Sequence, residues 1–295
     1  MRCRQRPDAA AYTADMIKLI GIDVDGTLVG ASGEIAPRVL QAAESARRAG
    51  IRLALCSGRP AFGLALDYAR QLDTDGWHVF QNGASIVELG SGQSRSAALP
   101  QEWIARLVAQ ARETGEVLEL YDDTSYVIES RNDWAREHAK LLGVPFEPRP
   151  FESLRGAAVR AQWLLPEERA KQVLAEDHAG LEIAQSTSPL MPGVRFVGMT
   201  RDGVSKGSAM RSIAAEYGFP MADVMYVGDA PNDLPALAVV GHPVAMGNAD
   251  PSVKRAATRT VGHVDTGGLA DALEFAIETH PAPSHETSPR PSEAQ

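Results

Sequence analysis

The sequence predicts an α/β fold, in which a doubly wound parallel sheet is interrupted by an inserted α+β domain. Toward both ends of the chain, short apolar runs rich in branched residues alternate with longer amphipathic segments. This alternation is typical of βαβ units and of a parallel sheet. From about residue 85 to residue 198 it gives way to short strand-like runs mixed with helices. We therefore expect one core sheet built from two separate stretches of the chain.

The elements expected in the core follow one another in a regular order. Residues 16–84 and 199–279 form the predicted core domain, and residues 85–198 form the predicted inserted domain. The first core stretch reads as strand 17–24, helix 37–50, strand 51–56, helix 62–72 and strand 77–81. The second core stretch reads as helix 204–218, strand 223–228, helix 232–240, strand 243–247 and a last helix 267–279.

The two ends of the chain lack this pattern. Residues 1–15 are polar and unpatterned, so they are expected to be a disordered or non-native extension, and Met1 and Met16 are both candidate starts of translation. Residues 280–295 are rich in Pro, Ser and Glu. Such a composition buries too little apolar surface to offset the entropy of ordering, so we expect a disordered tail.

Composition excludes several classes of function. The chain has 295 residues, 44% of them hydrophobic, which is enough for one large or two ordinary domains. The net charge of -9 disfavours nucleic acid and anionic membranes as partners. Only Cys3 and Cys56 could form a disulfide, so no disulfide framework is implied. With no membrane-length apolar stretch and no secretory signal, we expect a cytoplasmic protein.

Polar side chains follow three of the predicted core strands directly. Ligands of parallel sheets bind beyond the carboxyl ends of the strands, and adjacent strands would bring these side chains into one crevice. So many carboxylates in one place require a cation. The residues concerned are Asp23 and Asp25 after the first strand, Ser57, Gly58 and Arg59 after the second, and Asp229, Asn232 and Asp233 after the strand at 223–228.

Taken singly, these signals also have simpler structural explanations. Asp25 and Gly26 form a common turn dipeptide. Ser57 could cap the next helix, and Asp233 in a first helical turn would complement the helix dipole. A calcium loop of the EF-hand type fits less well, because a strand rather than a helix leads into the acidic residues.

Lys206 is more informative than any of these residues. It lies at the start of a predicted helix, where the positive end of the helix dipole disfavours another cation. One explanation is a solvated lysine, since the penalty is only about 0.3 to 1 kcal/mol at an exposed site. The other is a lysine aimed at a bound anion.

Together, and in this order, four motifs resemble those of the haloacid dehalogenase superfamily of phosphohydrolases. They are DVDGT at 23–27, SGR at 57–59, Lys206 and GDAPND at 228–233. The insertion, with QNGASIV at 81–87, resembles the Cof-type branch (subclass IIB). The resemblance implies a Rossmann-like core under an α+β cap. It also implies Mg²⁺-dependent hydrolysis of a phosphate monoester of a small metabolite, such as a sugar phosphate, by a monomer or homodimer.

The resemblance also implies a role for each matching residue. Asp23 would be the nucleophile that forms an aspartyl-phosphate, and Asp25 the general acid and base. Lys206 would neutralise charge in the transition state. The implied Mg²⁺ site comprises Asp23, Asp25 through its backbone carbonyl, Asp229, and Asp233 as a support of the metal shell or of Lys206. The implied phosphate and substrate contacts are Ser57, Gly58, Arg59, Asn82 and Asn232.

Two other functions fit parts of the sequence. Sugar phosphomutases of the same superfamily share the DVDGT start, whereas SGRP at 57–60 favours a hydrolase. A non-catalytic protein could use the same fold to sense a phosphorylated ligand. The presence of every charged group that catalysis needs argues against this alternative.

Overall fold

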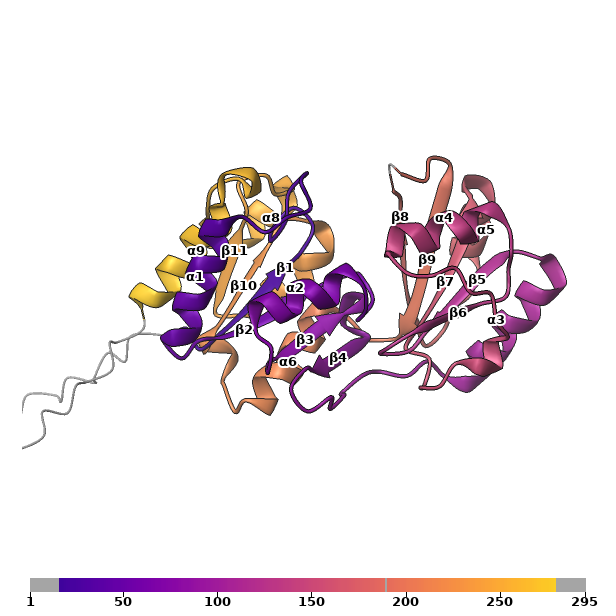
Figure 1. Cartoon of the computed structure of the whole chain (residues 1–295), viewed down its shortest axis with the longest axis horizontal. Coiled ribbons are helices and arrows are strands. Elements are labelled where there is room, and N and C mark those ends of the chain that lie inside the picture. Colours follow the sequence, from indigo (N-terminus) through magenta and orange to yellow (C-terminus); the bar gives the residue numbers. More distant parts are fainter. Residues whose placement is uncertain (1–15, 189, 280–295) are drawn as a thin grey trace, which may run out of the picture.

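The computed structural model describes residues 16–188 and 190–279. The extensions predicted at 1–15 and 280–295 lie outside the described residues. The described chain contains two separate sheets that occupy the two ends of an elongated molecule (Figure 1). The predicted fold class is confirmed, because a mainly parallel sheet is interrupted by an antiparallel sheet made from the middle of the chain.

The larger sheet has seven strands in the order β12-β11-β10-β1-β2-β3-β4. All neighbours are parallel except β3 and β4. The strand order reverses at the central pair of β10 and β1, which is where ligands of doubly wound sheets bind. The strands are β1 (Leu19–Asp23), β2 (Arg52–Cys56), β3 (Trp77–Phe80), β4 (Ser85–Glu88), β10 (Val224–Gly228), β11 (His242–Ala245) and β12 (Arg259–Thr260).

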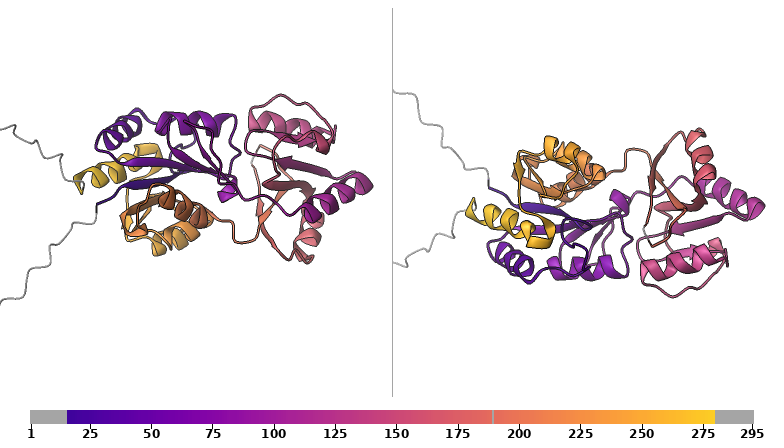
Figure 2. Two further views of the ribbon diagram at one scale, coloured as in Figure 1. Left: turned by 90° about the horizontal axis from the view of Figure 1, so that it is seen from below. Right: turned by 90° about the horizontal axis from the view of Figure 1, so that it is seen from above.

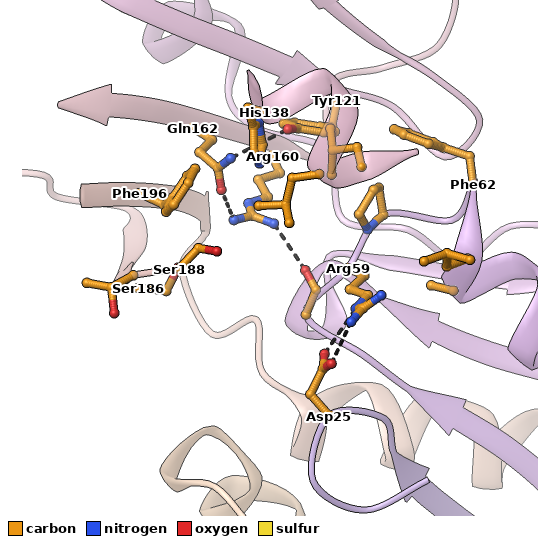
Figure 3. A pocket seen from close by; sticks show the side chains of 17 residues that line it. Asp25, Arg59, Phe62, Tyr121, His138, Arg160, Gln162, Ser186, Ser188 and Phe196 are labelled. Atoms are coloured by element: carbon orange, nitrogen blue, oxygen red, sulfur yellow. Dashed lines mark hydrogen bonds and ion pairs between the residues drawn. The ribbon is translucent and has the colours of Figure 1, made fainter. Parts of the chain in front are cut away.

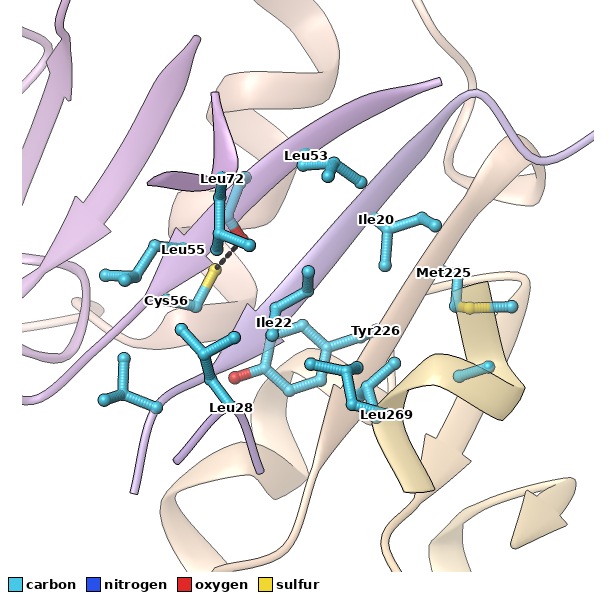
Figure 4. Close-up of a cluster of buried hydrophobic side chains, with 14 of the residues drawn as sticks. Ile20, Ile22, Leu28, Leu53, Leu55, Cys56, Leu72, Met225, Tyr226 and Leu269 are labelled. Carbon is cyan, nitrogen blue, oxygen red and sulfur yellow. Dashed lines mark hydrogen bonds between the residues drawn. The ribbon is translucent and has the colours of Figure 1, made fainter. Parts of the chain in front are cut away.

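Helices cover both faces of this sheet (Figure 2). One face carries α1 (Pro37–Arg48), α2 (Leu64–Leu72) and α9 (Gly268–Glu278), and the other carries α6 (Lys206–Glu216), α7 (Leu234–Leu237) and α8 (Pro251–Ala256). Because both faces are covered, the central strands are almost continuously apolar. Side chains of β1, β2 and β10 pack together in the core, among them Ile22, Leu55 and Tyr226 (Figure 4).

The smaller sheet has five antiparallel strands in the order β6-β5-β7-β9-β8. Its strands are β5 (Val117–Tyr121), β6 (Tyr126–Ile128), β7 (Arg160–Pro166), β8 (Leu181–Ser186) and β9 (Val194–Arg201), and its helices are α3 (Gln101–Thr114), α4 (Asp133–Leu142) and α5 (Glu167–Ala175). We call residues 99–201 the cap. The domain boundaries at 85 and 198 stay predictions. In the structure, β4, which begins at Ser85, belongs to the larger sheet, and β9 of the smaller sheet continues to Arg201.

Among residues 16–188 and 190–279, none of the helices combines the length and the apolar character that a membrane span requires.

A buried histidine links β2 to β3. The Nδ1 atom of His78 accepts a hydrogen bond from the Leu55 amide at 3.0 Å, and Nε2 donates to the Asp73 carbonyl at 2.7 Å. Both contacts require the neutral ring with its proton on Nε2. Burial of the fully enclosed side chain lowers the pKa of His78 to about 4.

Acid should therefore destabilise the protein through His78. Between about pH 6.5 and about pH 4, the unfolded chain protonates this ring and the folded protein does not, so the free energy of unfolding falls as the pH falls. In urea unfolding at several pH values, the wild-type free energy of unfolding should fall by up to about 3 kcal/mol over this range because of His78. His78→Gln should lack this contribution to the pH dependence. The exposed His263→Gln control should keep the wild-type slope. An unchanged slope in His78→Gln would contradict the assignment.

Candidate active site

The carboxyl ends of the three central parallel strands bring the predicted site residues together. Asp23 ends β1, Ser57 follows β2 and Asp229 follows β10, and β1 is hydrogen-bonded to both other strands. Lys206 enters from the first turn of α6. Ser205 caps that helix, because its Oγ accepts a hydrogen bond from the Ser208 amide at 3.1 Å. This cap fixes the backbone from which the Lys206 side chain extends.

Lys206 is buried between two carboxylates. Its side chain is 0% exposed, and Nζ lies 2.5 Å from Asp23 Oδ1 and 2.7 Å from Asp233 Oδ1. Burial alone would lower the pKa of Lys206, but Asp23 and Asp233 outweigh it and raise the pKa. A buried ammonium needs such partners, because its desolvation costs several kcal/mol. The solvated lysine considered from the sequence is therefore excluded.

Both carboxylate oxygens of Asp233 are already engaged. Oδ1 accepts hydrogen bonds from Lys206 and, at 2.7 Å, from the Tyr226 hydroxyl. Oδ2 accepts the backbone amides of Asp229 and Ala230, each at 3.0 Å. Asp233 is therefore arranged to hold Lys206 and the turn that carries Asp229.

Three carboxylates form a compact acidic cluster. Oxygen atoms of Asp23, Asp229 and Asp233 lie within 4.8 Å of one another. Thr27 Oγ1 donates to Asp229 Oδ1 at 3.0 Å, and Asn248 Nδ2 donates to the Gly26 carbonyl at 2.7 Å. One lysine among three acids leaves an excess of negative charge, and the donors are hard oxygen atoms of the kind that Mg²⁺ prefers. The residues therefore fit a divalent cation.

Burial and repulsion between neighbouring carboxylates raise the pKa values of two acids of the cluster. Burial and the neighbouring Asp233 raise the pKa of Asp23 well above its usual range, although Lys206 pulls in the opposite direction. Burial also raises the pKa of Asp229. A cation between these two carboxylates would lower both pKa values and hold both groups ionised.

Asp25 lies apart from this cluster, at the mouth of a cleft. Its side chain is 62% exposed and pairs with Arg59, with contacts of 2.5 Å from Nη2 to Oδ1 and 3.0 Å from Nε to Oδ2 (Figure 3). The chain turns sharply here, because Gly26 has φ +84° and the Leu28 amide bonds back to the Asp23 carbonyl at 3.2 Å. The turn thus places the exposed Asp25 side chain on the lining of the cleft, while Asp23 lies in the buried cluster.

The remaining predicted residues line the same region. Ser57 is buried, and its Oγ accepts the Arg59 amide at 3.0 Å. Asn232 Nδ2 donates to Asn82 Oδ1 at 3.1 Å. A Cβ added to Gly58 would lie 3.1 Å from that same Asn82 oxygen. All ten predicted side chains or backbone positions thus surround one edge of the sheet.

A cleft of about 510 Å³ lies between the core and the cap. The core contributes Asp25, Gly58 and Arg59 to its lining. The cap closes over it through Arg160, whose Nη1 donates to the Gly58 carbonyl at 3.1 Å, and through Gln81 Nε2, which donates to a cap backbone carbonyl at 3.2 Å. The cleft therefore opens directly onto the phosphate-binding turn expected at 57–59.

Sequence reasoning missed four residues that contact the site. Thr27 lies inside the DVDGT motif and Asn248 in the run HPVAMGNADPSVKRAAT at 242–258, so both had a local signal. Tyr226 and Arg160 had none, because each lies within an ordinary strand and meets its partner only through the tertiary fold.

Comparisons with known proteins agree with this geometry. The sequence profile of the haloacid dehalogenase-like hydrolases matches residues 20–273. The chain is similar to the pyridoxal phosphate phosphatase YbhA of Escherichia coli (strain K12), with 27% identity over 279 residues that cover 87% of this chain and 97% of that protein. A crystal structure of a haloacid dehalogenase-like hydrolase from Bacteroides thetaiotaomicron shares 27% identity at a TM-score of 0.77, covering 88% and 99%. The subclass IIB sugar phosphatase BT4131 shares 25% identity at a TM-score of 0.72, covering 88% and 99%.

Gly26 should be required for cation binding. A Cβ at this position would lie 2.2 Å from Asp229 Oδ2, so Gly26→Ala must displace that carboxylate. Titration calorimetry should show Mg²⁺ binding at least about tenfold weaker, equivalent to about 1.4 kcal/mol. Gly33→Ala is the matched control, because Gly33 also has positive φ (+70°) but its added Cβ would meet nothing closer than 3.9 Å. Equal loss in both variants would contradict the role of Asp229.

Proposed function

The chain belongs to the haloacid dehalogenase-like hydrolases, in their Cof-type (subclass IIB) branch, and on that premise we propose that it hydrolyses its phosphate monoester through an aspartyl-phosphate on Asp23. It is a phosphatase that acts on small phosphorylated metabolites. A sugar phosphate is the substrate class proposed here, supported by the likeness to the sugar phosphatase BT4131.

The contact between Lys206 and Asp23 is the observation that carries this proposal. A carboxylate attacks a phosphate ester poorly, because both carry negative charge. Lys206, 2.5 Å from Asp23, offsets that charge in a buried site where electrostatic interactions are strong. Attack by the Asp23 oxygen forms the new bond to phosphorus, and the bond from phosphorus to the alcohol oxygen breaks.

Asp25 is proposed to move the protons in both steps. In the first step the protonated form of Asp25, with one oxygen released from Arg59, gives its proton to the departing alcohol oxygen. In the second it takes a proton from the water that attacks the phosphorus of the aspartyl-phosphate, which regenerates Asp23 and releases phosphate. Its place at the cleft mouth supports this role, since the alcohol must leave through the cleft. Arg59 is proposed to orient Asp25 and to touch substrate.

Mg²⁺ is the proposed cofactor. When bound, it supplies positive charge to the phosphate oxygens. The carboxylates of Asp23 and Asp229 and the backbone carbonyl of Asp25 would hold it. Asp233 supports this site without binding the metal, since both of its oxygens have other partners.

The phosphate oxygens are proposed to bind the Ser57 hydroxyl and the Gly58 amide. Asn82 and Asn232, which contact each other at 3.1 Å, are proposed to lie against the substrate at the edge of the cap. Hydrolysis rather than phosphomutase chemistry is favoured by the phosphatases to which the chain is similar. A cytoplasmic location and a monomeric or homodimeric state stay predictions of the sequence.

Replacement of Asp23 by Asn keeps the shape of the side chain and removes the nucleophile. Phosphate release from p-nitrophenyl phosphate should fall by at least about a thousandfold in Asp23→Asn. EDTA should abolish wild-type turnover and Mg²⁺ should restore it. Asp67→Asn, a change to an exposed aspartate of α2, is the matched control and should keep wild-type turnover. Turnover that survives in Asp23→Asn would overturn the assignment.

A further inference from the structure

Arg160 is a cation of the cap that faces the substrate cleft. It is the first residue of β7 and is half-buried. Its side chain lines the cleft of about 510 Å³ and also a smaller cavity of about 200 Å³ that reaches Lys206 and Asn232. Figure 3 shows its guanidinium above Asp25 and Arg59, on the cap side. It therefore lies between the predicted phosphate site and the rest of the cleft.

Arg160 has only neutral partners at hydrogen-bond distance. Nη1 donates to the Gly58 carbonyl at 3.1 Å and Nη2 donates to Gln162 Oε1. Among residues 16–188 and 190–279, no carboxylate oxygen lies within 4.0 Å of its guanidinium, whereas Arg59 in the same cleft is paired with Asp25. Partial burial without a directly paired carboxylate disfavours the charged guanidinium and lowers the pKa of Arg160, although the nearby Tyr121 and Glu119 act in the opposite direction.

The cap is built to hold this side chain in place. Gly198 on the neighbouring β9 leaves the space, since a Cβ there would lie 3.1 Å from Nε and Nη2 of Arg160. The Gln162 amide nitrogen donates to Glu119 Oε2 at 3.0 Å. A carboxylate can only accept, so the Gln162 oxygen must face Arg160. Glu119 is fully buried and is itself held by His138 at 2.7 Å.

We infer that Arg160 binds a second anionic group of the substrate, so that the preferred substrates are phosphate monoesters that also carry a carboxylate or a further phosphate. This inference rests on the proposed hydrolysis of a phosphate monoester, and it selects among small phosphorylated metabolites those that carry a second anionic group. The phosphate that is cleaved already has Lys206, Ser57, the Gly58 amide and the cation. Arg160 comes instead from the cap, beside the part of the cleft that receives the leaving group. Its planar fork suits carboxylate or phosphate oxygens.

Matched substrates that differ only in the second group test this inference. The carboxylates are 2-phosphoglycolate, 3-phosphoglycerate and 6-phosphogluconate. Their neutral counterparts, with a hydroxymethyl group in place of the carboxylate, are 2-hydroxyethyl phosphate, glycerol 3-phosphate and glucitol 6-phosphate. Glucitol 1,6-bisphosphate supplies the second phosphate. For at least one anionic compound, the wild-type kcat/KM should exceed that of its counterpart by about tenfold or more, as expected for a hydrogen bond to a charged group.

Variants identify the residue responsible for the preference. In Arg160→Met, the ratio of kcat/KM between the anionic and neutral members of a pair should fall to about one. Arg160→Lys, which keeps the charge, should retain part of the preference for the anionic member. Arg195→Met removes an arginine of the same sheet that pairs with Glu167 outside the cleft, and should keep the wild-type ratio. Thermal unfolding of each variant checks that the fold is intact.

Each outcome has one meaning. A preference for the carboxylates or for the bisphosphate, lost in Arg160→Met, supports the inference and assigns the second group. Equal losses on anionic and neutral members would overturn it, because Arg160 would then serve the cleaved phosphate or cap closure. Equal wild-type rates on all pairs would also overturn the inference. If that turnover still depended on Asp23, the proposed function would stand. Absence of any Asp23-dependent turnover would overturn the proposed function, and this inference with it.

Discussion

The contacts of the buried Lys206 ammonium with Asp23 and Asp233 are the interaction on which the rest of the site depends. A parallel sheet collects the ends of its central strands at one edge, and here that edge collects three acids. Carboxylates so close repel one another, and burial adds to the cost of their charge. The lysine offsets part of this charge, and the remaining negative excess makes the site suitable for a divalent cation. A bound cation and the lysine together could then offset the charge of a phosphate.

The fold and the position of the site could be predicted because both depend on local patterns. Strands buried on both faces read as short apolar runs, and acids that follow such runs must meet at one edge if the strands are parallel. Asp23, Ser57 and Asp229 satisfy that rule without any knowledge of the tertiary contacts. The antiparallel attachment of β4 and the strand order of the cap depend instead on long-range pairing, for which the sequence carries no comparable signal.

Individual contacts of the site could be predicted less well than its location. The sequence places Asp233 near the cluster, but only the fold shows that Tyr226 and two backbone amides occupy its oxygens, which makes it a support. Arg160 looks like any polar residue at the start of a strand. Its position in the cleft depends on a hydrogen bond to the Gly58 carbonyl, about a hundred residues earlier in the chain, and on the space that Gly198 leaves on the neighbouring strand. Such partners leave no trace in spacing or periodicity.

Covalent phosphorylation of the Asp23 carboxylate during turnover is the step on which the proposed mechanism depends. Rapid acid quenching of the reacting enzyme, followed by borohydride reduction, converts an acyl phosphate on aspartate into homoserine, which peptide mass spectrometry can locate. We expect homoserine at position 23, in amounts that depend on substrate and Mg²⁺. Homoserine at another aspartate would contradict the role of Asp23. So would its absence at position 23 in enzyme that releases phosphate, provided that the quench preserves acyl phosphates.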